Sequence, residues 1–298
     1  MKLISGSSNK PLAESIAKKL GIEMLDVEIS KFENGEKKVA ISGNLHGENV
    51  CLVQSFSNPV DENIIEFLLL ADALKRMGVR HINLVLPWMG YSLQDKVFAS
   101  GSPISAKVVA DLISNSDVKR IFLLDLHNTS IPGFFSKPAH HDSAIDLFVN
   151  FAKLNFKQEN TIVVSPDFGG LKRARVFADK LNLDLVNIDK HRDYKTGKVT
   201  PMGVTGDVTG KICIIYDDVI NTGGTVVEVA KYLKEKGASE VHFLITHALF
   251  AGNAIQLMEN ENIDSVVITN SINHDSLPNK IKVLDCASIF ENNLRKWL

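Results

Sequence analysis

Apolar runs and amphipathic segments alternate along most of the 298 residues. The apolar runs, rich in β-branched and aliphatic side chains, cover residues 2–5, 49–56, 81–87, 120–127, 161–167, 211–218, 240–246 and 265–270. Because each run is nearly continuous in apolar character, it predicts a strand covered on both faces of a parallel sheet. Between these runs, residues 63–78, 104–114 and 225–237 follow a helical period. Strands that alternate with helices predict the α/β fold class.

An internal repeat predicts the domain organisation, because residues 71–86 align without gaps on residues 230–245. Identical residues fall on four corresponding positions: Ala71 with Ala230, Leu74 with Leu233, Lys75 with Lys234, and Gly78 with Gly237. Chance similarity of two helix–glycine–strand segments is the alternative. We expect two similar domains, 1–140 and 141–279, each a mainly parallel sheet flanked by helices. The boundary falls near the polar residues 136–143, and residues 280–298 pack back on the first domain.

Charge and cysteine content narrow the class of protein. The 33 basic residues nearly cancel the 35 acidic ones, so a general nucleic-acid binder is not expected and any phosphate must be held by a local site. Cys51, Cys213 and Cys286 are far apart in sequence, which favours reduced, buried thiols. The N-terminal sequence lacks an apolar core followed by a small-residue cleavage site, so a secretory signal is not expected. Polar residues interrupt the uncharged stretch 241–258, so it is not expected to span a membrane. We therefore expect a cytoplasmic protein without a membrane partner.

Residues 211–235 carry the most informative pattern: an apolar strand, the acid pair Asp217 and Asp218, a short loop and an amphipathic helix. The loop residues that provide hydroxyl groups or backbone freedom are Asn221, Thr222, Gly223, Gly224 and Thr225. Loop N–H groups and a helix N-terminus would bind a phosphate, and the carboxylates would bind sugar hydroxyls or a metal. The alternative is a structural turn in which Thr225 caps the helix.

The acid pair followed by Asn-Thr-Gly-Gly-Thr resembles the phosphoribosyl-diphosphate-binding motif of phosphoribosyltransferase-fold proteins. Other segments resemble the ribose-phosphate diphosphokinases (phosphoribosyl diphosphate synthetases), from the N-terminus to about residue 255. Residues 31–36 are similar to the family loop that contacts the adenine of ATP from a neighbouring subunit, although Asn-Gly also suits an ordinary turn. Residues 87–107 resemble the Tyr-x-Arg-Gln-Asp loop, with Leu93 in place of the arginine.

Three further segments extend the resemblance. The Asp-Leu-His sequence at Asp125 to His127 is similar to the family segment whose His binds magnesium or the ATP phosphates. Residues 163–175 match the Ser-Pro-Asp-x-Gly-Gly pattern, in which Asp167 suits a metal or ribose contact; Lys172, Arg173 and Arg175 beyond it are also compatible with a solvated helix face. Residues 187–200 resemble the flexible catalytic loop.

The resemblance implies a set of site residues. Lys190 and Arg192 would be catalytic and neutralise charge on the transferred phosphates. The positions expected to bind ATP are Phe32, Asn34, Gly35, Glu36, Gln94, Asp95 and His127. The positions expected to bind ribose 5-phosphate are Asp167, Asp217, Asp218, Asn221, Thr222, Gly223, Gly224 and Thr225. Mg²⁺ would bridge the ATP phosphates, with His127 and Asp167 as its protein contacts.

The reaction implied is transfer of the β,γ-diphosphate of ATP to the 1-hydroxyl of ribose 5-phosphate, with self-association into dimers or hexamers. A phosphoribosyltransferase is an alternative, but it would not explain residues 31–36 or the Asp-Leu-His segment. A non-catalytic regulatory relative is the other alternative, favoured by Leu93. The adjacent His140 and His141 have no further ligand at a recognisable spacing, and we expect them in the interdomain linker.

Overall fold

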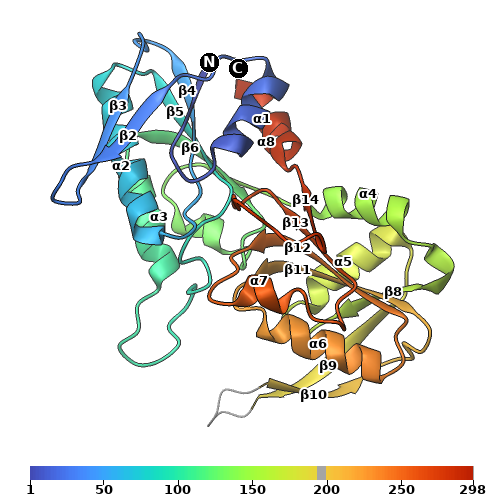
Figure 1. The fold of residues 1–298 in the computed structure, drawn as a ribbon. Helices are drawn as coiled ribbons and strands as arrows, with labels where there is room; N and C mark the ends of the chain where they lie inside the picture. The colour runs from blue at the N-terminus through green and yellow to red at the C-terminus, as the bar shows by residue number, and fades with distance from the viewer. Residues whose placement is uncertain (193–198, 298) are drawn as a thin grey trace. The chain divides into compact units, whose positions relative to one another are not determined.

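The computed structural model describes residues 1–192 and 199–297, with the backbone alone described at 190–192 and 199–202. The chain forms two compact units (Figure 1). The first unit comprises Met1–Ser143, Asn270–Asn273 and Asp285–Leu298, and the second comprises Ala144–Thr269 and His274–Leu284. The segments near the C-terminus therefore belong partly to each unit.

The first unit is built on a parallel sheet with the order β1-β4-β5-β6-β7. Its strands are β1 (Lys2–Ser5), β4 (Asn49–Val53), β5 (His81–Leu86), β6 (Val118–Leu124) and β7 (Ala139–Asp142). A separate antiparallel hairpin is formed by β2 (Val27–Lys31) and β3 (Lys37–Ile41). The helices are α1 (Lys10–Leu20), α2 (Val60–Arg76), α3 (Ser105–Asn115) and α8 (Ala287–Leu294), with short 3₁₀ turns η1 (Ile131–Phe134) and η3 (Arg295–Trp297).

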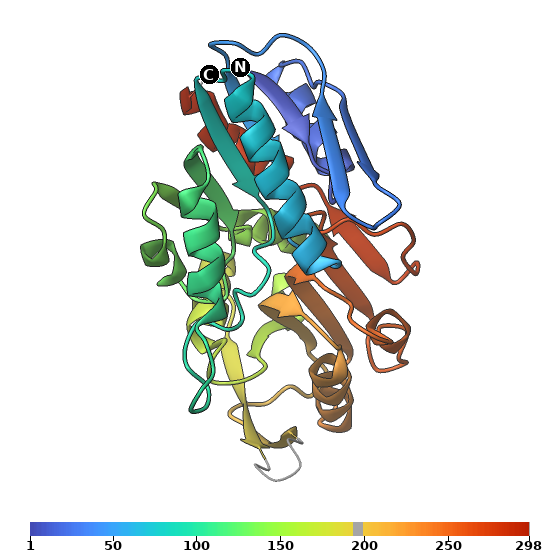
Figure 2. The ribbon, with the colours of Figure 1, turned by 90° about the vertical axis from the view of Figure 1, so that its left-hand side faces the viewer.

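Helices cover both faces of this sheet, as its apolar strands require. Helices α2 and α3 share one buried apolar cluster with alternate strand residues such as Ile4, Leu52 and Leu84, and Figure 2 shows the two helices on one side of the sheet. Helices α1 and α8 lie together on the other side (Figure 1).

The second unit has a seven-stranded sheet with the order β10-β9-β8-β11-β12-β13-β14, in which only the β9–β10 pair is antiparallel among the described strands. The strands are β8 (Thr161–Ser165), β9 (Leu185–Arg192), β10 (Val199–Val204), β11 (Ile212–Ile220), β12 (Glu240–Ala248), β13 (Ser265–Thr269) and β14 (Ile281–Leu284). The helices are α4 (Ile145–Asn155), α5 (Leu171–Leu181), α6 (Gly224–Glu235) and α7 (Ala254–Leu257), with a 3₁₀ turn η2 (Gln158–Asn160). Strand β11 occupies the centre of the sheet.

The aligned helix–glycine–strand segments coincide in their hydrogen bonds as well as in sequence. Gly78 and Gly237 follow α2 and α6 with φ of +74° and +86°, a conformation in which glycine is unstrained. Each glycine carbonyl accepts a hydrogen bond of 2.8 Å from a glycine N–H that precedes a strand, Gly47 before β4 and Gly210 before β11. Two similar α/β units explain this correspondence better than chance, and the predicted fold class is confirmed.

All eight apolar runs contain strands and all three helical segments contain helices, but the polar strands were not anticipated. His140 and His141 were expected in a linker, and this was wrong, because both lie in the edge strand β7. The His141 Nε2 accepts a hydrogen bond from the Leu126 N–H at 2.8 Å, and the His140 ring stacks on Phe122. Ring stacking and the hydrogen bond to His141 thus place both imidazoles in the strand even though the sequence AHHD is polar.

All three cysteines are buried thiols, as expected. Within residues 1–192 and 199–297, no helix is both long and apolar enough to cross a bilayer.

Candidate active site

An acid pair lies on the central strand of the second unit. Asp217 and Asp218 belong to the last four residues of β11, which continues to Ile220 beyond the end predicted from sequence. The Asp218 side chain is 4% exposed, and that of Asp217 is 25% exposed. The site is therefore at the carboxyl edge of a parallel sheet, where α/β proteins bind ligands.

Arg173 neutralises part of this negative charge. It is the third residue of α5, and its Nη1 donates to Oδ1 of Asp217 and, at 2.8 Å, to Oδ1 of Asp218. The sequence left Arg173 undecided between a functional contact and a solvated helix face. The structure assigns it to the site.

Burial raises the pKa of Asp217 well above its usual range, and the charge of Asp218 raises it further. The Arg173 guanidinium lowers the same pKa, although not enough to offset burial. Two carboxylates that share one cation leave an excess negative charge, so a metal ion or sugar hydroxyl donors at this place would be stabilised.

The loop after β11 presents an open helix N-terminus. Helix α6 begins at Gly224 without a side-chain cap, so the alternative in which Thr225 caps the helix is not seen. Gly223 has φ +79°, and a Cβ at this position would lie 2.8 Å from Cε of Met258. The remaining loop residues, Asn221, Thr222, Gly224 and Thr225, are exposed. Backbone N–H groups at such a terminus bind anions.

A hollow of about 210 Å³ joins these features. Its polar lining comes from Asp167, Asp217, Asn221, Thr222 and Thr225. The Asp167 Oδ1 accepts a hydrogen bond of 2.9 Å from the Gly170 N–H, which fixes the turn before α5. Six of the eight residues predicted for ribose 5-phosphate thus line this hollow, and the other two, Asp218 and Gly224, are adjacent to them in the chain.

The β2–β3 hairpin carries the first group of predicted ATP residues. Its tip is closed by a 2.8 Å hydrogen bond from the Phe32 N–H to the Glu36 carbonyl, and the Asn34 Oδ1 accepts from the Glu36 N–H at 3.2 Å. Gly35 has φ +89°. The tip is therefore an ordered turn, and it presents the Phe32 ring with 53% of its surface exposed.

The second group of predicted ATP residues lies beyond β5 and β6. The Gln94 Oε1 accepts from the Ser105 hydroxyl at 2.7 Å, so Gln94 is tied to the first turn of α3. The Asp95 Oδ2 accepts from the Asn128 Nδ2 at 2.6 Å, next to the exposed His127. Asn128 was not singled out from sequence, because an amide beside a candidate His gives no signal of its own.

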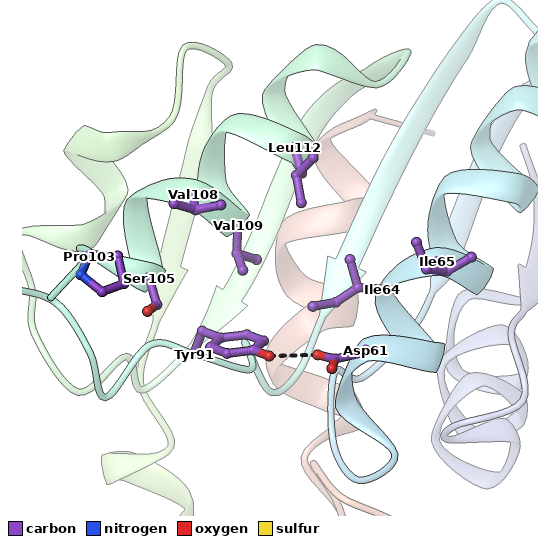
Figure 3. A pocket seen from close by; sticks show the side chains of 9 residues that line it. All are labelled: Asp61, Ile64, Ile65, Tyr91, Pro103, Ser105, Val108, Val109 and Leu112. Atoms are coloured by element: carbon purple, nitrogen blue, oxygen red, sulfur yellow. Dashed lines mark hydrogen bonds between the residues drawn. The ribbon is translucent and has the colours of Figure 1, made fainter. Parts of the chain in front are cut away.

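An apolar groove of about 500 Å³ lies between α2 and α3, as Figure 3 shows. Its lining includes Ile64, Ile65, Val108, Val109 and Leu112. At one end the Tyr91 hydroxyl donates to the Asp61 carboxylate at 2.6 Å. None of the predicted site residues lines this groove.

The predicted catalytic residues Lys190 and Arg192 occupy the end of β9, where the backbone pairs with Pro201 and Val199 of β10. Their side chains lie outside the described part of the structure.

A parallel α/β sheet with an acid pair and an open glycine loop on its central strand is the construction of phosphoribosyltransferase-type domains. Comparison with known proteins is more specific. Residues 1–116 match the N-terminal domain of ribose phosphate pyrophosphokinase, and residues 192–297 match the phosphoribosyl synthetase-associated domain.

Curated relatives cover almost the whole chain. The ribose-phosphate pyrophosphokinase of Fusobacterium nucleatum is 41% identical over 98% of this chain and 93% of its own length, and that of Aquifex aeolicus is 40% identical over 99% and 95%. The crystal structure of phosphoribosylpyrophosphate synthetase from Mycobacterium smegmatis superposes with a TM-score of 0.92 at 33% identity, covering 99% of this chain and 98% of that one. The chain belongs to the ribose-phosphate pyrophosphokinase family and is an enzyme, a transferase of the kinase type.

Proposed function

We propose that this enzyme transfers the β,γ-diphosphate of ATP to the 1-hydroxyl of ribose 5-phosphate, giving 5-phosphoribosyl 1-diphosphate and AMP for nucleotide biosynthesis. The observation that carries the proposal is the hollow at the carboxyl edge of β11, which combines Asp217 of the acid pair with an uncapped helix N-terminus. Anion and hydroxyl partners are thus available side by side, as a sugar phosphate requires. The full-length relatives named as pyrophosphokinases support the same reaction.

Ribose 5-phosphate would be oriented by two sets of groups. The N–H groups and hydroxyls of residues 221–225 hold the 5-phosphate, and Asp217 and Asp218 accept hydrogen bonds from the ring hydroxyls. Arg173 donates to both carboxylates and holds them aligned until those hydroxyls arrive. Orientation of this kind contributes a large part of the rate in phosphoryl-type transfer.

ATP would be bound by residues of the first unit, the hairpin tip at Phe32 and the loops that carry Gln94, Asp95 and His127. The 1-hydroxyl attacks the β-phosphorus, the bond to the α-phosphate oxygen breaks, and AMP leaves with the electron pair. Lys190 and Arg192 neutralise the charge that develops on the bridging oxygens. In this proposal the first unit binds ATP and the second unit binds ribose 5-phosphate.

A divalent cation of the Mg²⁺ type fits the donors of the second unit. Within the described ranges no cluster of three His, Cys, Asp or Glu side chains forms a protein cage. Mg²⁺ commonly takes only one or two carboxylates and completes its shell with water and substrate phosphates. Asp167 would be one such ligand, and His127 suits a phosphate better because Mg²⁺ prefers oxygen. The ion would supply charge neutralisation on the diphosphate.

Self-association into dimers or hexamers and a cytoplasmic location complete the proposal. The regulatory relative remains the second candidate, because Leu93 stands where the family has an arginine that faces the nucleotide.

One incubation separates the candidates. The purified chain is mixed with ribose 5-phosphate, MgATP and inorganic phosphate, and AMP, ADP and phosphoribosyl diphosphate are resolved by chromatography. Equal amounts of AMP and phosphoribosyl diphosphate are expected. Ribose 5-phosphate binding without AMP would favour the regulatory relative instead.

A further inference from the structure

Two carboxylates on α2 meet two lysines of the β2–β3 hairpin. Glu62 and Glu66 are one helical turn apart on α2, and Lys31 and Lys37 face each other across the last pair of the hairpin. The Lys31 Nζ lies 2.8 Å from Glu62, and the Lys37 Nζ pairs with Glu66 and lies 3.9 Å from Glu62. Both strands are thus tied to one helix at the point where the tip begins.

The two ion pairs differ in burial. The Glu66 side chain is fully buried and that of Lys37 is 10% exposed. The Lys31 and Glu62 side chains are 50% and 43% exposed, and the hydrogen bond from Lys31 lowers the pKa of Glu62. Screening by water weakens the outer pair, so the buried Lys37–Glu66 pair holds the hairpin more strongly.

Glu66 is itself fixed to the sheet of the first unit. Its Oε1 accepts from the Ser7 N–H at 2.6 Å and from the Gln54 Nε2 at 3.0 Å, and these residues follow β1 and β4. A Cβ on Gly6 would clash with Oε1 of Gln54 and lie 2.7 Å from this oxygen, so the Gln54 and Glu66 side chains together fill the space that glycine leaves open. The hairpin tip is therefore connected through Lys37 and Glu66 to the carboxyl ends of β1 and β4.

A hairpin of two strands is marginally stable alone, so its tip needs an external support. Near its base the hairpin is supported by apolar contacts, because Val39 and Ile41 pack against the apolar cluster of the unit. Toward its tip the support is ionic, and the Phe32 ring beyond it is exposed.

We propose that Lys37 and Glu66 are positioning residues that hold the hairpin tip in place for nucleotide binding. This inference rests on the proposed function, in which residues 32–36 contact ATP. The Lys37–Glu66 pair affects the binding of ATP but not that of ribose 5-phosphate, because every residue that lines the sugar-phosphate hollow belongs to the second unit.

The test compares Lys37→Met with Lys38→Met. Lys38 is the next residue of β3, half exposed and 3.8 Å from Glu28, so its replacement removes the same charge without touching α2. Lys37→Met is expected to raise KM for ATP about tenfold, since displacing a binding group by about 1 Å has effects of this size or larger. KM for ribose 5-phosphate should stay within about twofold, and Lys38→Met should change neither constant.

A second variant separates a loss of positioning from a loss of folding. Lys37→Met leaves Glu66 buried without its cation, whereas the double variant Lys37→Met with Glu66→Gln leaves no unpaired charge and keeps an acceptor for Ser7. The double variant should melt close to the wild type and still show the raised KM for ATP. An unchanged KM for ATP in the double variant would overturn the positioning role. A wild type that forms no phosphoribosyl diphosphate would instead overturn the proposed function.

Discussion

Arg173 bonds both carboxylates of the acid pair, so its replacement by methionine tests how the site is held together. The variant keeps much of the side-chain volume but removes the cation. Breaking a fully buried ion pair costs about 3–5 kcal/mol, and breaking an exposed one costs less than about 1 kcal/mol. Because 24% of Arg173 and 25% of Asp217 are exposed while Asp218 is buried, we expect a loss of about 2 kcal/mol in the free energy of unfolding.

The loss should depend on pH with a defined sign. Burial and Asp218 raise the pKa of Asp217 above its unfolded value, and Arg173 opposes them. Between the unfolded and the folded pKa the native state binds more protons than the unfolded state, so stability falls as pH rises through that window. Without Arg173 the folded pKa of Asp217 rises further, so the pH range over which stability falls extends to higher pH. Because the folded pKa of Asp217 is already about 7 with Arg173 present, the added destabilisation is expected to grow from pH 7 to pH 9.

The assay is thermal unfolding of both proteins at pH 7 and pH 9, with Lys172→Met as the matched control. Lys172 is the exposed neighbour of Arg173 on α5. Arg173→Met should lower the melting temperature at pH 9 by about 4–8 °C, and by less at pH 7. The reasoning is refuted if the variant melts like the control at pH 9, or if its deficit is the same at both pH values.

Other predictions follow from the same geometry. Relative to the wild type, Asp217→Asn should raise the melting temperature at pH 7 but not at pH 4, because the variant no longer buries an ionised carboxylate. A variant that melts like the wild type at both pH values would contradict the raised pKa of Asp217. Gly223→Ala should weaken ribose 5-phosphate binding about tenfold by calorimetry, through strain and contact with Met258. Gly210→Ala, with similar φ but open space, is its control and should bind normally. Burial raises the pKa of Cys51 and of Cys213 to about 12. A thiol reagent at pH 8 should therefore label neither cysteine until urea unfolds the protein. Rapid labelling of the folded protein would contradict this, because it would show that these strands become accessible to solvent.

The pattern of apolar positions predicted the sheet cores but not their edges. Residues such as 121–124 and 213–216 are apolar without interruption, because both faces of their strands are buried. Strands β2 and β3 alternate or mix polar with apolar residues, and β7 reads Ala-His-His-Asp, so no continuous apolar run marks them. The formation of such polar strands depends on cross-strand and tertiary contacts that a linear pattern does not encode.

The loop at 221–225 could be predicted because its chemistry is local: glycine freedom and a helix start lie within five residues. The role of Arg173 could not, since the direction of a long side chain from a helix depends on tertiary packing. The Lys37–Glu66 pair joins residues 29 apart. A glutamate inside an amphipathic helix looks the same in sequence whether it is exposed or fully buried.

The fate of the β-phosphate of ATP tests the central claim most directly. ATP carrying radioactive phosphorus in its β-phosphate is incubated with the enzyme, a divalent cation and ribose 5-phosphate, and the label is followed by chromatography. Diphosphate transfer predicts that all transferred label appears in phosphoribosyl diphosphate while AMP is unlabelled. Label retained in ADP, with a singly phosphorylated product at C1, would contradict the account.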